Sequence, residues 1–159
     1  MAFVNFELLD KEVLNLQKQF NGAKPFRFVV IDGMLTEVAA TEALNSFPPV
    51  TAGIWNRTTY INQRKKLQSS AVTYSAFFEK LFAELNSERT LAFLTQLSGI
   101  KNLTGDDRFF GAGFHQSVNG AFLDVHVDFN VHPDKKLYRR LNLLIFLNRD
   151  WKEAYDGAL

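Results

Sequence analysis

Two histidines and three aspartates fall within thirteen residues, Phe122 to Asp134, in the stretch FLDVHVDFNVHPD. Nowhere else in the 159-residue chain do these two kinds of side chain gather in this way. Imidazole and carboxylate groups are common ligands of first-row transition metals. His126 and Asp128 stand two residues apart, so on an extended strand both side chains would project from the same face. The spacing indicates either a metal site or an ordinary solvated strand face, and it leaves both open.

The remaining histidines do not complete such a site by spacing. His132 is six residues beyond His126, which is roughly 20 Å of extended chain at about 3.3 Å per residue. We therefore do not expect His126, Asp128 and His132 to share one ion, and Pro133 favours a turn after His132. His115 stands on the preceding predicted strand, where we expect a core or supporting histidine. Because the chain has no cysteine, thiolate ligands, disulfides and a cysteine nucleophile are excluded.

The segment around His126 alternates strictly between apolar and polar residues. One face would carry Leu123, Val125, Val127, Phe129 and Val131, and the other Asp124, His126, Asp128, Asn130 and His132. We expect the apolar face to pack on phenylalanine-rich helices. The polar face would then line a cavity beside the apolar strand that follows in the sequence.

Periodicity predicts helices first and strands afterwards. Helical spacing of apolar residues predicts helices over residues 7–20, over 36–47 with Thr36 as the cap, and a pair within 74–97. Runs rich in aliphatic and aromatic residues predict strands over 25–35, 109–118, 121–131 and 140–148, with 50–72 irregular. This order is typical of an α+β fold, with a helical layer against a sheet or barrel.

Composition narrows the class of protein. The length fits a single domain over residues 1–159, and 47% hydrophobic with 22% charged residues is ordinary for a globular chain. A net charge of +1 gives no electrostatic reason to expect nucleic acid or a membrane as partner. No signal-peptide pattern or membrane-length apolar run is present, so we expect a cytoplasmic protein. The oligomeric state is left open.

Several motifs together resemble one enzyme family. The segment HVDFN, followed by RRLNLLIFLNRDW and YDGAL, resembles the iron(II)- and 2-oxoglutarate-dependent oxygenases of the prolyl 4-hydroxylase type. PFRFVVIDGMLTEVAATEALNSFP is similar to the lead-in of that family, so the likeness covers about residues 24–159. The resemblance implies a double-stranded β-helix, or jelly roll, with N-terminal helices packed on it.

The resemblance also implies a reaction and its cofactors. Family members hold Fe(II) with two histidines and one carboxylate, leaving open positions for 2-oxoglutarate and O2. His126 and Asp128 match the first two ligands. The implied reaction hydroxylates a prolyl or other peptide residue, or a small molecule, while 2-oxoglutarate becomes succinate and CO2. Ascorbate is a further candidate cofactor.

Four more residues are assigned near the co-substrate or substrate. Gln116 and Phe146 occupy two positions where the family often has tyrosine near 2-oxoglutarate. Asn142 would face the same pocket, or else be a buried asparagine satisfied by the backbone. Arg139 would meet the substrate at the mouth of the site, or else mark a solvated strand entrance.

The chain departs from the family in its last third. The family's distal histidine, and the Arg or Lys that pairs with the far carboxylate of 2-oxoglutarate, would lie several tens of residues further on. This sequence has no histidine after His132 and no Arg or Lys after Lys152. We therefore expect a lead-in over residues 1–105 and only the first half of a jelly roll over 106–159, as in a fragment inactive by itself. The alternative is a non-catalytic jelly-roll or cupin-like binding domain.

Overall fold

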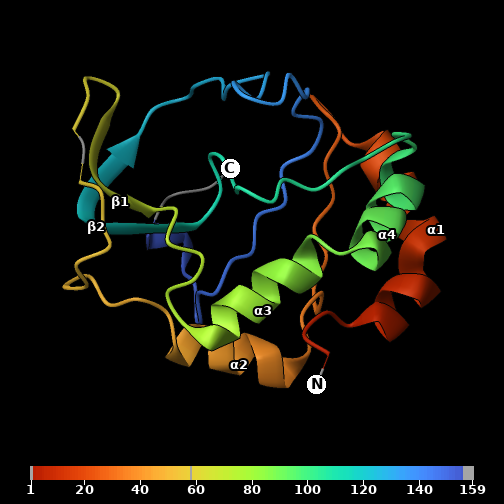
Figure 1. The fold of residues 1–159 in the computed structure, drawn as a ribbon, viewed down its shortest axis with the longest axis horizontal. Coiled ribbons are helices and arrows are strands. Elements are labelled where there is room, and N and C mark those ends of the chain that lie inside the picture. Colours follow the sequence, from red (N-terminus) through yellow and green to blue (C-terminus); the bar gives the residue numbers. More distant parts are fainter. Residues whose placement is uncertain (1, 58, 156–159) are drawn as a thin grey trace. The chain divides into compact units, whose positions relative to one another are not determined.

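The computed structural model describes residues 2–57 and 59–155 and has a mixed α+β architecture (Figure 1). The elements are α1 (Phe6–Gly22), α2 (Glu37–Asn45), β1 (Gln63–Ser69), α3 (Ala76–Leu85), α4 (Glu88–Ser98), β2 (Phe114–Leu123) and the short 3₁₀ helix η1 (Glu153–Tyr155). They form two compact units. The helical unit, Met1–Asn45 with Ala76–Asp107, contains the four α-helices, and the sheet unit, Ser46–Ser75 with Arg108–Leu159, contains β1 and β2.

Helix α1 supplies the largest apolar stripe of the helical unit. Its buried residues recur three or four positions apart, as one face of an α-helix requires: Phe6, Leu9, Val13, Leu16 and Phe20. Asn5 caps the helix, since its side-chain oxygen accepts the N–H of Leu8 at 3.3 Å. The stripe packs on α4, which buries Phe93 and Leu97. All four predicted helices are confirmed.

The junction between α3 and α4 is held by hydrogen bonds at Ser87 and Thr90. Ser87 is the N-cap of α4, and its hydroxyl accepts the backbone N–H of Thr90 at 3.3 Å. Thr90 is fully buried and donates its own hydroxyl to the carbonyl of Glu84 at 2.8 Å. The Glu84 carboxylate in turn accepts the backbone N–H of Val4 at 3.0 Å, which fixes the start of the chain to α3.

Removing the cap of α4 should weaken the helical unit. Ser87→Ala leaves the Thr90 N–H without its acceptor, and we expect a loss of about 1 kcal/mol in the free energy of unfolding. Urea denaturation followed by far-ultraviolet circular dichroism measures this loss. Ser87→Asp keeps a capping oxygen and should retain most of the stability. Equal losses in the two variants would contradict the capping role.

The sheet unit is built on an antiparallel pair of strands. The register runs from Gln63 opposite Leu123 to Ser69 opposite Phe114, and it shifts between Arg64 and Lys66. Cross-strand partners share a face of the ribbon, and neighbours along a strand alternate between faces. Leu67, Ser69 and Phe114 are buried on one face. The opposite face therefore carries the pairs Lys66 with Ser117 and Gln68 with His115.

Aromatic rings fill the buried side of this ribbon. Phe114 meets Phe47 edge-on at 5.5 Å between ring centroids, and Tyr74 at 6.3 Å. Trp55 lies 6.2 Å from Phe47, and its indole N–H donates to the carbonyl of Pro49 at 2.7 Å. The sheet unit thus has an aromatic core of its own.

The strand predictions are largely wrong in their bounds. Strand β1 lies inside the segment 50–72 that was predicted to be irregular, and β2 ends at Leu123, whereas the sequence predicts a strand as far as residue 131. No strand forms over 25–35 or 140–148 in the part of the chain that the structure describes. A strand needs a hydrogen-bonded neighbour as well as suitable residues, and alternation alone does not reveal the neighbour.

The predicted packing of the apolar face beyond β2 is also not found. Val125 and Val127 are almost fully exposed, and Phe129 and Val131 keep more than a third of their surface in contact with solvent. The turn predicted at Pro133 is confirmed, and it brings Val131 opposite Tyr138 in an isolated antiparallel bridge.

No helix in the described ranges is long and apolar enough to cross a membrane.

Candidate metal centre

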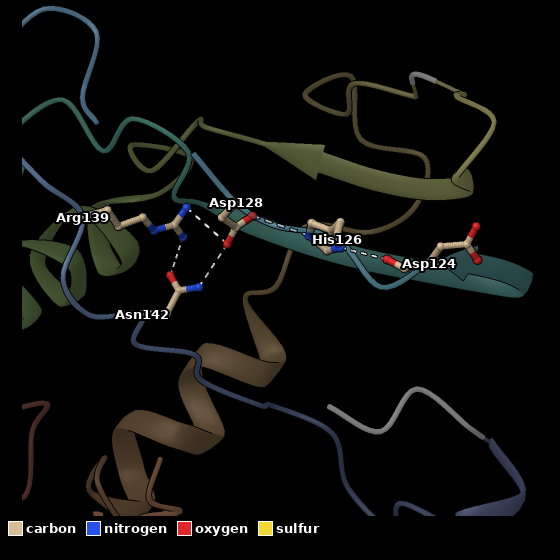
Figure 2. Close-up of polar contacts among 5 residues, drawn as sticks. All are labelled: Asp124, His126, Asp128, Arg139 and Asn142. Carbon is tan, nitrogen blue, oxygen red and sulfur yellow. Dashed lines mark hydrogen bonds and ion pairs between the residues drawn. The ribbon is translucent and has the colours of Figure 1, made fainter. Parts of the chain in front are cut away.

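Beyond β2 the chain bends at Val125, and His126 follows this bend. The backbone N–H of Asp124 still donates to the carbonyl of Asn62, at 2.9 Å, just beyond the end of the ladder. The ring Nδ1 of His126 lies 2.9 Å from the carbonyl oxygen of Asp124 (Figure 2). A carbonyl oxygen can only accept, so Nδ1 carries the proton of this hydrogen bond. In the neutral ring, Nε2 then keeps a free lone pair.

That lone pair is directed at a carboxylate. His126 Nε2 lies 3.5 Å from Asp128 Oδ1, and both side chains are partly exposed. Two ligand atoms that each lie about 2.1 Å from one ion at a right angle are about 3 Å apart, so the observed pair could close on a metal with a small adjustment. Without a metal, the same contact is an ion pair when the imidazole is protonated.

The other oxygen of Asp128 is held by side chains from a second segment. Asp128 Oδ2 lies 3.3 Å from Arg139 Nη1 and accepts a hydrogen bond from Asn142 Nδ2 at 3.2 Å (Figure 2). Arg139 also donates to Asn142 Oδ1, and its guanidinium lies over the ring of Phe129. The carboxylate is therefore oriented through Oδ2, while Oδ1 is left facing the imidazole.

The turn at Pro133 is what brings these segments together. The backbone N–H of Arg139 donates to the carbonyl of Asn130 at 2.8 Å, which sets residues 139–142 beside residues 127–130. The two segments line an open groove of about 200 Å³. The groove gives a ligand from solvent access to Asp128.

The face of the β1–β2 ribbon that lies opposite the buried Leu67 carries Lys66 and His115. Both residues feel the charge of Asp128. Desolvation lowers the pKa of Lys66, and the negative charge of Asp128 opposes this effect. The pKa of His115 is lowered by desolvation and by repulsion from Lys66 and Arg139, with Asp128 again acting in the opposite direction. His115 is exposed at the surface of the strand, yet its neighbours remove enough water to disfavour the charged ring. Both Lys66 and His115 thus lie within range of the Asp128 charge.

Gln116 and Phe146 are the other two residues that the sequence predicts near the co-substrate. Gln116 is the cross-strand partner of Leu67, so its side chain belongs to the buried face of the ribbon, opposite Lys66 and His115. Its Oε1 is buried and has no hydrogen-bond partner among the described residues. Phe146 lies in a loop and is 66% exposed. The predicted contact of Gln116 and Phe146 with a co-substrate stays a prediction.

A third protein ligand does not come from the described residues. Within these ranges no three His, Asp or Glu side chains converge on a point where an ion could sit. His132 is buried, and its Nδ1 accepts the backbone N–H groups of Asp134 and Lys135, both at 3.1 Å. His132 therefore stabilises the turn. The spacing in the sequence likewise predicts that His132 does not share an ion with His126 and Asp128.

Lys66 is the residue of this cluster that the sequence did not reveal. It stands in QRKKLQS, within a stretch predicted to be irregular, and it is 62 positions before Asp128. Only the register of β1 against β2, which local patterns do not encode, brings it to the face coupled to Asp128.

Comparison of the chain with protein-family models, with curated proteins and with solved structures finds no match. The function of the site must therefore be inferred from its own residues and motifs.

Proposed function

We propose that the protein is an Fe(II)- and 2-oxoglutarate-dependent dioxygenase of the prolyl 4-hydroxylase type, with His126 and Asp128 as two of the iron ligands. The observation that carries the proposal is the pair of lone-pair atoms, His126 Nε2 and Asp128 Oδ1, which face each other at 3.5 Å. The ring proton is committed to the carbonyl of Asp124, and this second contact is typical of metal-binding histidines.

The neighbouring side chains have supporting roles in this proposal. Asn142 and Arg139 orient the carboxylate of Asp128 through Oδ2, so that Oδ1 stays available to an ion. Both are therefore positioning residues here, although the sequence suggested co-substrate and substrate contacts for them. The chemistry that iron supplies in such sites is O2 activation, with hydroxylation of a substrate coupled to the conversion of 2-oxoglutarate into succinate and CO2.

The jelly roll belongs to the same proposal. The antiparallel β1–β2 ribbon, with the His-x-Asp sequence just beyond β2, supports it. The proposed substrate is a prolyl or other residue of a peptide, or a small molecule, and ascorbate is a candidate accessory reductant. We place the reaction in the cytoplasm.

Succinate formation tests the proposed reaction. The purified chain is incubated in air with Fe(II), ascorbate and 2-oxoglutarate, and succinate is measured by proton NMR. We expect succinate above the protein-free control, because His126 and Asp128 are proposed to hold the iron that reacts with 2-oxoglutarate. This result would contradict the expectation from the family pattern that the chain is inactive by itself. Succinate at the level of the protein-free control, with and without a proline-rich peptide, would contradict the proposal.

A non-catalytic binding domain is the second candidate. It is favoured by one observation, namely that Arg139 and Asn142 already hold the Asp128 carboxylate without an ion, and His126 pairs with it when the imidazole is protonated. In that case Fe(II) with 2-oxoglutarate leaves the melting temperature unchanged and no succinate forms. A rise in melting temperature that requires both additions favours the oxygenase.

A further inference from the structure

A bulge in β2 faces a single residue of β1, Lys65. The register leaves Lys65 opposite residues 118–121, between two flanking ladder pairs, Arg64 with Phe122 and Lys66 with Ser117. Lys65 has a φ of 54° and Gly120 a φ of 74°, and such left-handed residues are typical of bulges. Asn119 and Gly120 are both exposed. The peptide bond between them therefore lies outside the ladder, in contact with water.

The side chain of Lys65 lies against this peptide bond. Its ammonium donates to the backbone carbonyl of Asn119 at 3.2 Å. It also lies close to Gly120, since a Cβ added to that glycine would be 3.3 Å from Lys65 Nζ. A positive charge thus sits beside the peptide group that joins Asn119 to Gly120.

The side-chain amide of Asn119 is available for reaction with that peptide group. It makes no hydrogen bond with any residue in the ranges that the structure describes. An asparagine followed by glycine can form a cyclic imide, because the glycine N can reach the side-chain Cγ without obstruction by a Cβ. The glycine N–H must first lose its proton, and the negative charge then spreads onto the carbonyl oxygen of the same peptide group. Lys65 donates to this oxygen, so it stabilises the charge that develops there.

We propose that Asn119 is a site of spontaneous deamidation and that Lys65 promotes the reaction. The N of Gly120 bonds to Cγ of Asn119 while the bond from Cγ to Nδ2 breaks. Ammonia leaves with the proton of the Gly120 N–H, and a cyclic imide remains. Water then opens the ring at the carbonyl beside Lys65, which gives isoaspartate. The new carboxylate derives from the carbonyl that Lys65 contacts, so the hydrogen bond becomes an ion pair.

A second Asn-Gly pair in the chain provides an internal reference. Asn21 and Gly22 are also exposed, but they lie in the last turn of α1. Asn21 Nδ2 donates to the carbonyl of Gln17 at 3.0 Å, and the helical backbone directs the N–H of Gly22 away from the Asn21 side chain. Cyclisation at Asn21 requires this turn to open first. We therefore expect the reaction there to be slower than at Asn119.

Peptide mass spectrometry measures both sites in the same sample. The full chain is incubated in mildly alkaline buffer and then digested with pepsin in acid, where the reaction stops. We expect Asn119 to deamidate at least about 10-fold faster than Asn21, with isoaspartate as the main product. Lys65→Met should slow the reaction at Asn119 about 10-fold, because it removes a charge-assisted hydrogen bond, and should leave Asn21 unchanged. Lys65→Arg keeps a cationic donor and should restore most of the rate.

The adjacent lysine provides the matched control. Lys66→Met removes the same charge from the next residue of β1, which pairs with Ser117 in the ladder, and should leave Asn119 at its native rate. In urea the contact of Lys65 with Asn119 is lost, so the native chain and Lys65→Met should then deamidate equally at Asn119.

Three results would overturn the proposal. Equal rates at Asn119 and Asn21 in the native protein would show that the bulge does not favour the reaction. Equal rates at Asn119 in Lys65→Met and Lys66→Met would exclude a specific role for the Lys65 contact. A difference between the native chain and Lys65→Met that persists in urea would assign the effect to the local sequence and not to the fold.

Discussion

Replacing either His126 or Asp128 by alanine is expected to lower succinate formation at least about 100-fold, since each removes a proposed iron ligand. The expected loss is in metal binding, because the two side chains are partly exposed and contribute little to the core. The far-ultraviolet circular dichroism and the urea midpoint should therefore stay at their native values. Succinate release at saturating 2-oxoglutarate, over a range of Fe(II) concentrations, measures the effect.

Asp124→Ala is the matched control for these variants. Asp124 is the same residue type in the same segment, but it contacts His126 through its backbone carbonyl, which alanine keeps. We expect native succinate formation from this variant. If Asp124→Ala loses as much activity as Asp128→Ala, or if His126→Ala keeps native activity, the assignment of the ligands is wrong.

Leu9→Ala should destabilise the helical unit by about 3 kcal/mol. Leu9 is fully buried at the centre of the α1 stripe, so alanine leaves a cavity in addition to losing apolar contact. Urea denaturation followed by far-ultraviolet circular dichroism measures the loss, because the four α-helices lie in this unit.

Leu14→Ala on the same helix separates burial from helix propensity. Leu14 is 64% exposed, so the same substitution there should change the free energy of unfolding by less than about 0.5 kcal/mol. Both tryptophans, Trp55 and Trp151, belong to the sheet unit, and their fluorescence follows that unit separately. A loss at Leu14 as large as the loss at Leu9 would contradict the packing described for α1.

The helices were predictable because their signals are local. Leu9, Val13 and Leu16 recur at the period of the helix, and caps such as Thr36 sit within three residues of the groups they bind. The strands were not predictable in the same way, because a strand forms only with a hydrogen-bonded partner, and that partner can lie anywhere in the chain. Leu67 and Phe114 are buried together by a pairing that spans more than forty residues, and neither segment alone indicates it.

The residues of the candidate site were also predictable where the signal is local and not where it depends on strand pairing. The spacing of His126 and Asp128 placed them together, and the structure brings the ring and the carboxylate within 3.5 Å. Asn142 and Arg139 were singled out as polar residues near an apolar segment, and they do reach the cluster, but through Asp128. Lys66 was missed because its place depends on the long-range register of β1.

Binding of Mn(II), followed by electron paramagnetic resonance, tests the central claim most directly. We predict that the native chain binds one equivalent of Mn(II), and that 2-oxoglutarate tightens this binding because it coordinates the same ion. The double variant His126→Ala with Asp128→Ala should bind no Mn(II). Equal Mn(II) binding by the native chain and the double variant, or no binding by either, would contradict the claim that His126 and Asp128 form a metal centre.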